Sequence, residues 1–529
     1  FATLPHPSTL SHSSLIKEEQ SPIPSRPETM ILLILVTLFL LFLFQQMYWR
    51  TRPYPPGPTP IPVLGNLHTI LREFPGQTAL NRWRKQYGKI FTHWLGSIPI
   101  VSVADYQTIH EMFVLDGDNY ADRGTLSKFT EEFRGGILGI IETSGSVWRD
   151  QRRFALHTLR DFGMAKEAMQ ERILYEAVAL LDKLEEEANS KGTASPLKLI
   201  EQSVASVINL VIFGYRFDET TLHELQKNRQ LQDDIIAIGK NPLNSIPLNF
   251  PTTAKIWPFK QIKERVMKIR DEQFSFFEKN IEKHRAKIDY SNDECEDFCD
   301  AYLKEMERRK DDPETSFHDK QFVNVCIDLW SAGMETTAMT MSWGMIYLLH
   351  HPLVQEKLHE EYDRVIGSDR LITMADKNAL PYTAAYINEL QRCANILPQN
   401  LLRQTTKDIT IDGIQIPSGT AVCPQISVLM CDPEIFPDPE SFNPSRFIDE
   451  SGKVKTVKQL LPFSIGKRQC PGEGLARMEL FLFFSNLVHR FKISPSDPLN
   501  LPSLERTFAL VGKPPSFEVK LEGRFLKSS

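Results

Sequence analysis

One loop near the C-terminal end combines a cysteine with glycines and cations in a pattern that suits a metal-bound thiolate. Residues 463–472 read FSIGKRQCPG, which gives Cys470 a glycine on either side and Arg468 two positions earlier. The apolar pattern that follows predicts a helix over residues 475–488. A thiol just before a helix N-terminus and beside a guanidinium is favoured as a thiolate, the form that binds metals. The glycines would let the backbone approach a large flat group.

The other six cysteines show no comparable grouping. Cys295 and Cys299 form a C-x3-C pair among acidic residues, and no second ligand pair follows at zinc spacing. The remaining cysteines resemble ordinary buried or half-buried thiols (Cys326, Cys393, Cys423 and Cys431). Seven scattered cysteines do not make a secreted disulfide scaffold, and reduced thiols on the cytosolic side fit better.

A carboxyl and two hydroxyls lie within the longest apolar segment, residues 322–350. Residues 332–337 read AGMETT, which places Glu335 beside Thr336 and Thr337. A hydroxyl can hold a water as donor and acceptor, and a neighbouring carboxylate can relay protons from solvent. A core helix with a glycine for close packing is the simpler interpretation. We expect the Thr336 hydroxyl to be the active one, and Thr337 could bond back to a helix carbonyl.

Two further pairs have helical spacing. Trp148 and Arg152 are one turn apart and share a face, and Glu389 and Arg392 are three residues apart. Taken alone, the first pair is an amphipathic helix edge. The second is a solvated ion pair worth a few tenths of a kcal/mol.

The elements that must position these residues are mostly helical. Helical patterns cover residues 164–187, 260–285, 298–310, 322–350 and 354–366, and strand-like stretches cover 98–103 and 409–416, the latter turning at Asp412-Gly413. The chain has 529 residues, which alone would suggest about three domains. Its net charge of −6, with 41% hydrophobic and 24% charged residues, excludes a disordered or multi-span membrane protein and gives no reason to expect nucleic acid.

The chemical groupings together resemble the signatures of cytochrome P-450 enzymes. The loop matches the haem-binding signature at Phe463, Gly466, Arg468, Cys470 and Gly472, with Ala476 in place after it. The segments around Glu389 and Arg446 occur in the expected order. The resemblance covers about residues 53–520 and is greatest to the microsomal family two enzymes of animals, which handle xenobiotics and lipids. It implies a mainly α fold with a small β region, a single triangular haem domain and one N-terminal membrane anchor helix.

The resemblance also implies a role for each matched residue. Haem b would be the cofactor, with Cys470 as its axial thiolate ligand, and Glu389, Arg392 and Arg446 would brace the haem core. Glu335 and Thr336 would be the catalytic acid–alcohol pair, and Ala332 and Gly333 would leave room for oxygen. The other cofactor-binding positions would be Arg123, Trp148, Arg152, Arg403, Phe463, Arg468 and Gly472. Some relatives carry His at the position of Arg403, and Met334 stands where many have Thr.

The implied reaction is insertion of one oxygen atom from O2 into an apolar substrate such as a xenobiotic, a fatty acid or a steroid-like compound. The rivals are a haem-thiolate isomerase or dehydratase, which has no use for an acid–alcohol pair, and a non-catalytic membrane haem or ligand carrier. By position in the family, the substrate-facing segments are residues 125–137, 235–249, 397–402 and 507–510, with Cys326, Leu329 and Ala332 on the long helix.

The implied electron donor is NADPH-cytochrome P-450 reductase, with cytochrome b5 as a second candidate. Arg149 and Arg153 lie on a helix face about 100° from the Trp148/Arg152 pair. Three lysines precede the cysteine loop, at positions 453, 455 and 458. Together these cations could steer an acidic flavoprotein to the thiolate side, although a solvated basic face is as good an interpretation of any one of them.

The N-terminal part predicts a membrane anchor. Residues 1–29 are rich in Ser and Pro and are expected to be a disordered extension, with Met30 as the natural start. Residues 30–50 form the expected transmembrane anchor, 51–66 a stiff proline-rich linker, and 67–529 the haem domain. A cleaved signal peptide or a buried core helix are the alternatives. Arg50 and Arg52 after the apolar run predict a single pass through the endoplasmic reticulum membrane, with the catalytic domain facing the cytosol.

Overall fold

The computed structural model describes residues 27–124, 128–162, 167–239, 244, 247, 252–507 and 511–525. The chain divides into two compact units, of which the first ends at Thr51 and the second begins at Arg52. In the first unit, helix α1 (Pro27–Met47) is followed by the short helix η1 (Trp49–Thr51). The helix therefore begins three residues ahead of the expected anchor. The residues before Pro27, expected to be disordered, lie outside the described part.

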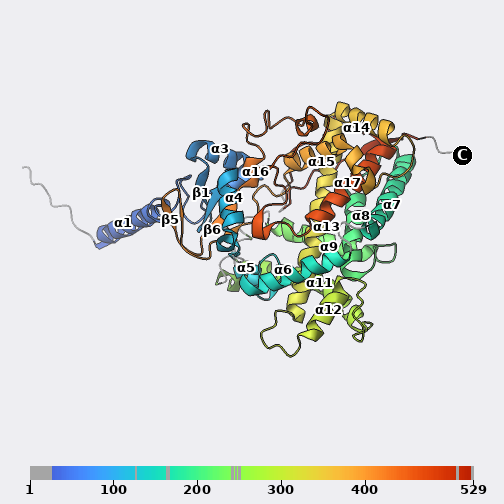
Figure 1. Cartoon of the computed structure of the whole chain (residues 1–529). Helices are drawn as coiled ribbons and strands as arrows, with labels where there is room; N and C mark the ends of the chain where they lie inside the picture. Colours follow the sequence, from blue (N-terminus) through green and yellow to red (C-terminus); the bar gives the residue numbers. More distant parts are fainter. Residues whose placement is uncertain are drawn as a thin grey trace, which may run out of the picture. The chain divides into compact units, whose positions relative to one another are not determined.

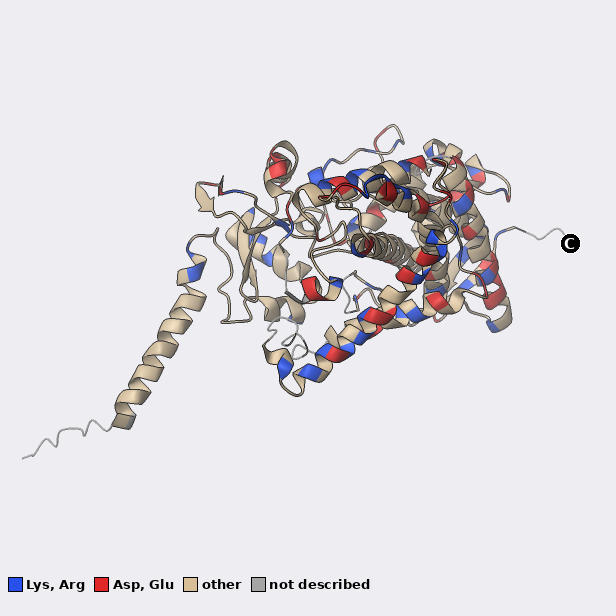
Figure 2. Ribbon diagram, turned by 90° about the horizontal axis from the view of Figure 1, so that it is seen from below, with Lys and Arg blue, Asp and Glu red and all other residues tan. Residues whose placement is uncertain are grey.

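Helix α1 has the length and composition of a membrane span. The segment Thr29–Thr51 is long and apolar enough to cross a bilayer, and none of its apolar stretch is buried. No Lys, Arg, Asp or Glu interrupts it between Thr29 and Trp49 (Figure 2). Helix α8 (Pro196–Phe213) passes the same length and composition test, but it is mostly buried in the core of the second unit. Its burial identifies α8 as a core helix.

The second unit is mainly helical. Its remaining α-helices in chain order are α2 (Leu67–Arg72), α3 (Gln77–Tyr87), α4 (Tyr106–His110), α5 (Lys128–Arg134), α6 (Gly145–Asp161), α7 (Glu167–Lys191), α9 (Leu222–Gly239), α11 (Phe259–Arg285), α12 (Phe298–Arg308), α13 (Asp319–His350), α14 (Pro352–Val365), α15 (Pro381–Ala394), α16 (Ile426–Leu429) and α17 (Glu473–Arg490). The helices predicted from the sequence are confirmed with shifts of a few residues at their ends. Residues 164–166, where one of them was expected to begin, lie outside the described part.

A small β region accompanies the helices. Its main sheet has the order β1-β2-β6-β3, formed by β1 (Ile90–Leu95), β2 (Ile98–Val103), β6 (Ala421–Pro424) and β3 (Arg403–Gln404). Two antiparallel pairs are separate from it: β4 (Ile409–Ile411) with β5 (Ile414–Ile416), and β7 (Phe491–Pro495) with β8 (Val519–Gly523). In Figure 1 the main sheet lies with α3, α4 and α16 at one side of the unit, and α7, α8, α14 and α17 lie at the other. The predicted strand 98–103 and the hairpin turning at Asp412-Gly413 are confirmed.

Helix α13 runs through the core, as its sequence predicts. It has 32 residues, and apolar side chains of its own cover nearly its whole circumference. The helix is therefore buried on most sides. Gly333 lies against α8, where an added Cβ would stand 2.8 Å from the Ile208 Cγ1. The glycine therefore permits a close helix crossing. The expectation that Gly333 leaves room for oxygen is wrong for this residue, since that space is filled by Ile208.

The proline-rich segment is held to the sheet rather than standing free as a spacer. The Thr92 backbone N–H of β1 donates to the Pro56 carbonyl at 3.1 Å. Gly57 lies so close to the same strand that an added Cβ would overlap the Thr92 carbonyl oxygen. Gly65 pairs with both Ile61 and Leu95 in isolated bridges. These contacts make the segment part of the second unit.

Candidate active site

The cysteine loop presents Cys470 at the start of α17. The Cys470 N–H donates to the Phe463 carbonyl at 2.9 Å, which closes the loop on itself. Gly466 has a positive φ of 74° and lies against the Phe113 carbonyl, where no side chain would fit. This glycine therefore packs the loop against the protein rather than against a cofactor. Gly472 is different, because an added Cβ there would lie 4.0 Å from the Cys470 sulfur, in the space around the thiol.

The surroundings of Cys470 shift the pKa of its thiol in both directions. Its side chain is exposed, yet enough protein surrounds it for burial to raise the pKa of the thiol. The backbone N–H groups of Gly472 and Glu473 and the charge of Arg152 lower that pKa, but burial outweighs them. Without the metal, the balance for this thiol therefore lies on the side of the protonated form. The donors are placed to stabilise a thiolate once a metal ion displaces the proton.

Four arginines gather beside this loop. Arg468 lies over the Trp148 ring at 4.0 Å, and the Arg152 Nη2 donates to the Gln469 carbonyl at 2.5 Å, one residue before Cys470. Arg123 and Arg403 approach closely enough for their charges to lower the pKa of Arg468 further, after burial, which is the larger cause. Among the residues that the structure describes, none of these four arginines forms an ion pair. Such a concentration of buried positive charge calls for an anion.

The donor set fits the carboxylates of haem b. The Trp148 Nε1 and the Arg403 Nη1 are buried without a hydrogen-bond partner among the described residues. An indole N–H and guanidinium groups are the donors that a propionate needs, and an unpaired buried donor costs about 1–3 kcal/mol. The other guanidiniums now bond to backbone carbonyls, Arg468 to those of Ala121 and Thr143. The structure thus brings together Trp148 and the four arginines, five of the positions that the resemblance to the family implies for cofactor binding.

On α13, the side chains of the sequence-predicted residues do not all point the same way. Ala332 is exposed although the helix around it is buried, and Thr336 is half-buried. The Thr336 hydroxyl donates to the Ala332 carbonyl at 2.8 Å. Thr337, rather than bonding back to a helix carbonyl, donates to the Glu479 Oε2 at 3.0 Å. The two hydroxyls therefore make the reverse of the contacts expected from the sequence.

Glu335 is directed toward α9 and α8. Its Oε1 lies 3.2 Å from the Arg229 Nη1, and the same guanidinium pairs with Glu201 at 2.7 Å. Burial raises the pKa of Glu335, and the charge of Arg229 lowers it. Glu335 and Thr336 are neighbours in the chain, but their side chains are engaged with different partners.

A cavity lies between α13 and the cysteine loop. Its volume is about 50 Å³, below the usual range for ligand sites, and part of it opens to solvent. Thr336, Thr337 and Thr340 line it from α13, and Phe463 lines it from the loop. The rest of its lining consists of Gln391, Ala394, Asn395, Ile396, Leu397, Asn400, Ile426, Met430, Pro462, Ala476 and Leu480.

The structure places the other residues that were expected to face the substrate in different surroundings. Leu397 from the segment 397–402 lines the cavity, and Leu329 is half-buried. Cys326 is fully buried in the core, so the expectation that it faces substrate is wrong. Residues 125–127, 508–510 and most of 240–249 lie outside the described part of the chain.

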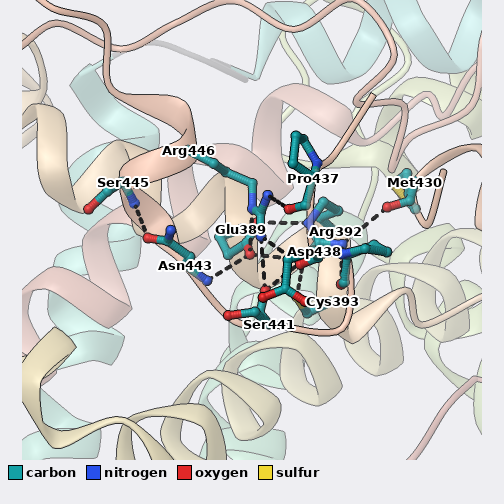
Figure 3. Close-up of polar contacts among 11 residues, drawn as sticks. Glu389, Arg392, Cys393, Met430, Pro437, Asp438, Ser441, Asn443, Ser445 and Arg446 are labelled. Atoms are coloured by element: carbon teal, nitrogen blue, oxygen red, sulfur yellow. Dashed lines mark hydrogen bonds and ion pairs between the residues drawn. The ribbon is translucent and has the colours of Figure 1, made fainter. Parts of the chain in front are cut away.

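The predicted contacts of Glu389 with Arg392 and Arg446 are present (Figure 3), with Glu389 and Arg392 buried and Arg446 half-buried. Glu389 lies 2.7 Å from the Arg392 Nε and 3.0 Å from the Arg446 Nε. Arg446 also donates to the Pro437 carbonyl at 2.7 Å, and the Asn443 N–H donates to Glu389 at 2.9 Å. The triad ties α15 to the loop before the cysteine motif.

Sequence reasoning missed three polar residues near the cavity. They are Glu479, Gln391 and Asn395, of which Gln391 and Asn395 line the cavity and Glu479 lies behind its wall. A carboxyl within the run Met478–Val488 was the available signal, because apolar residues dominate the rest of that helix. Gln391 and Asn395 carry no comparable signal, since amides are common on exposed helix faces.

Comparisons with known proteins support the same assignment. The family model described as Cytochrome P450 matches residues 55–521. Cytochrome P450 2B4 of Oryctolagus cuniculus is 37% identical over 474 residues, 89% of this chain and 94% of the relative. Cytochrome P450 2B19 of Mus musculus and cytochrome P450 2C8 of Homo sapiens are 36% and 34% identical, each over 89% of this chain and 94% of the relative. With a cysteine loop beside a cluster of arginines, and a match to the family model over most of its length, the chain belongs to the cytochrome P450 family of haem-thiolate monooxygenases.

Proposed function

We propose that the protein inserts one atom of O2 into an apolar organic substrate, with Cys470 as the ligand of haem b and with electrons from NADPH supplied through a flavoprotein reductase. The observation that carries this proposal is the cluster of four arginines beside Cys470, which have no ion-pair partner in the described part of the chain. Haem with a thiolate ligand supplies the activation of O2 and the transfer of its oxygen.

The protein's own residues then bind, orient and exclude water. Trp148 and the four arginines would hold the haem carboxylates, which fixes the rotation of the ring. The N–H groups of Gly472 and Glu473 would stabilise the negative sulfur. Ala332 is exposed on α13, and the Thr336 hydroxyl, which donates to a carbonyl, can still accept a hydrogen bond from water. Glu335 would have to exchange its pairing with Arg229 to assist as the neighbouring acid.

The apolar side chains of the cavity favour an apolar substrate. Leu397, Ile426, Met430 and Leu480 supply surface that a lipid, a steroid-like compound or a xenobiotic can cover. The hydroxyl and amide groups among the lining residues would set the orientation of the substrate.

We further propose that α1 anchors the enzyme in the endoplasmic reticulum membrane as a single pass, with residues 52–529 on the cytosolic side. The apolar span ends at Arg50 and Arg52, which favours retention of that end in the cytosol. Arg149, Arg153 and the lysines at 453, 455 and 458 are exposed, as reductase docking requires.

Oxidation under isotopically heavy O2 tests the reaction. With reductase, NADPH and a panel of lipids and drugs, we expect substrate-dependent NADPH consumption and one heavy oxygen atom in each product molecule. Rearrangement of a peroxide without NADPH would instead assign the chain to the isomerases. Tight haem and ligand binding with no turnover would make it a carrier.

A further inference from the structure

A second cavity borders α17 on the face that points away from the cavity between α13 and the cysteine loop. Its volume is about 430 Å³, within the usual range for small-molecule sites. Gly474 and Met478 of α17 line it, whereas Ala476 and Leu480 line the cavity beside α13. Residues two apart lie about 200° apart around a helix, so the two cavities occupy opposite faces of α17. The second cavity is therefore separate from the site proposed for haem.

Two cations from different elements line this second cavity. Lys377 comes from the short helix η6 (Met374–Ala379), and Arg477 comes from α17. Lys377 is half-buried, and its ammonium has no ion-pair or hydrogen-bond partner among the residues that the structure describes. Burial lowers the pKa of Lys377, and the charge of Arg477 lowers it further. Arg477 pairs with Glu473 at 2.8 Å, so Lys377 is the cation that lacks a counter-charge.

The first turns of two long helices border the same cavity. Helix α17 begins at Glu473 and contributes Gly474, and α7 begins at Glu167 and contributes Gln170. The N–H groups of a first turn have no acceptor within the helix, and that end of a helix carries partial positive charge. The Gln170 Oε1 accepts the Met374 N–H at 2.7 Å, which ties α7 to η6. Two helix ends thus add positive potential to that of the two side chains.

The carboxylates nearest to Lys377 along the chain and across the cavity do not supply its counter-charge. Asp376 is held by Arg370, with 2.8 Å between oxygen and nitrogen. Glu167 lines the cavity but is exposed, and its charge does not contribute to the pKa of Lys377. A half-buried ammonium whose charged neighbour is a guanidinium calls for an anion from outside the chain.

The rest of the wall suits an apolar group attached to that anion. Met374 is half-buried and Met478 is buried, and thioethers make favourable contacts with aromatic rings. A phosphate has several acceptor oxygens, which can bond to an ammonium, a guanidinium and helix N–H groups at the same time. We propose that this cavity binds a small organic phosphate, with the phosphate between Lys377, Arg477 and the first turn of α17, and with an apolar or aromatic body against the two methionines.

Calorimetric titration of the haem-loaded protein with phenyl phosphate tests the ligand class. We expect a single molecule to bind per chain, with an affinity that falls as the ionic strength is raised. Inorganic phosphate lacks the ring and phenol lacks the charge, so each should bind about tenfold more weakly or worse. An affinity for either of them equal to that for phenyl phosphate would overturn the proposal.

Substitutions in the cavity wall test the location. Lys377→Gln removes the unpaired charge, and we expect it to weaken the binding of phenyl phosphate about tenfold or more. Ala375→Glu places a carboxylate in the wall at an exposed position and should abolish binding. Lys198→Gln removes an exposed lysine of α8 outside the cavity, and it should bind as the wild type does. Wild-type affinity in Lys377→Gln would overturn the proposal.

Competition with imidazole identifies the cavity that phenyl phosphate occupies. Imidazole binds haem iron, so at saturation it fills the haem site and should leave the affinity for phenyl phosphate unchanged. Displacement of phenyl phosphate by imidazole would place the probe at the haem and overturn the proposal. The proposal does not rest on the proposed reaction. Binding that depends on Lys377, in a protein that forms no product from NADPH, would therefore overturn the proposed function alone.

Discussion

The Glu389 carboxylate balances the charge of two guanidiniums, although none of its surface reaches solvent. A buried charge is tolerated only where partners replace water, and here Arg392, Arg446 and the Asn443 N–H provide that replacement. The arginines extend the network to the Met430 and Pro437 carbonyls. At the scale of single residues, both arginines of this triad therefore depend on Glu389 for their charge compensation, and Glu389 depends on them.

Glu389→Gln should therefore destabilise the protein strongly. The amide keeps the shape of the side chain but leaves two guanidiniums without a counter-charge, which costs about 3–5 kcal/mol for a buried pair. We expect a lower thermal midpoint of the holoenzyme and a lower haem content after expression. The matched change Glu450→Gln, at an exposed position, should alter neither quantity. Wild-type stability in Glu389→Gln would show that the triad is not a brace.

Glu479 should give the protein a characteristic dependence of stability on pH. Its pKa in the folded protein, about 8, lies above the ordinary value of 4.5, so the folded state holds this proton more tightly than the unfolded state. The stability that the proton contributes is complete below about pH 4.5 and is lost as the pH rises to about 8. The thermal midpoint of Glu479→Gln relative to wild type should therefore rise between pH 5 and pH 8. A constant difference would contradict the raised pKa.

Part of this chemistry could be predicted from residue types and their spacing in the sequence. The directions in which the side chains point could not. Cys470, Arg468 and the Trp148/Arg152 face could be predicted because their roles depend on spacing along one loop or one helix. The pairing of Glu335 with Arg229 could not, since Arg229 lies 106 positions earlier and on another helix. The same holds for Thr337 and Glu479, which meet only when α13 packs on α17.

At the scale of elements, α6 presents two chemically different faces. Trp148 and Arg152 lie on the face toward the arginine cluster, and Arg149 and Arg153 are exposed. Arg153 forms a surface ion pair with Asp150 at 3.2 Å, which solvent makes weak. A helix of this kind can bind the cofactor on one side and meet a redox partner on the other.

Arg149→Glu combined with Arg153→Glu should slow turnover that depends on the reductase. The exposed arginines act mainly on the association rate, so the loss should shrink at high salt. Turnover supported by peroxide should be unchanged, because it needs no docking. Steady-state rates at low and high ionic strength measure both effects. An equal loss in the two assays would indicate misfolding instead.

At the scale of the whole molecule, the chain consists of an apolar helix and a catalytic unit that begins at Arg52. The mainly helical fold and the small β region could be predicted, because long apolar periodicities and turn residues determine them locally. The attachment of the proline-rich segment to β1 could not be predicted, since it depends on backbone hydrogen bonds that any sequence could make.

Removal of residues 1–50 should release much of the protein from microsomes and leave haem binding intact. Exposed apolar residues such as Ile256 and Trp257 can keep part of it on the membrane, so complete release is not required. Fractionation and haem absorbance measure the two properties. Glycosylation of the catalytic unit, or its protection inside the lumen, would contradict the proposed orientation.

The absorption spectrum of the reduced protein with carbon monoxide tests the central claim most directly, that Cys470 is the axial thiolate ligand. We predict the red-shifted band of a thiolate-ligated haem in the wild type and in Cys295→Ser, which changes a cysteine far along the chain from the loop. Cys470→Ser should lose the band. Retention of the red-shifted band in Cys470→Ser would contradict the assignment of the ligand and the site built around it.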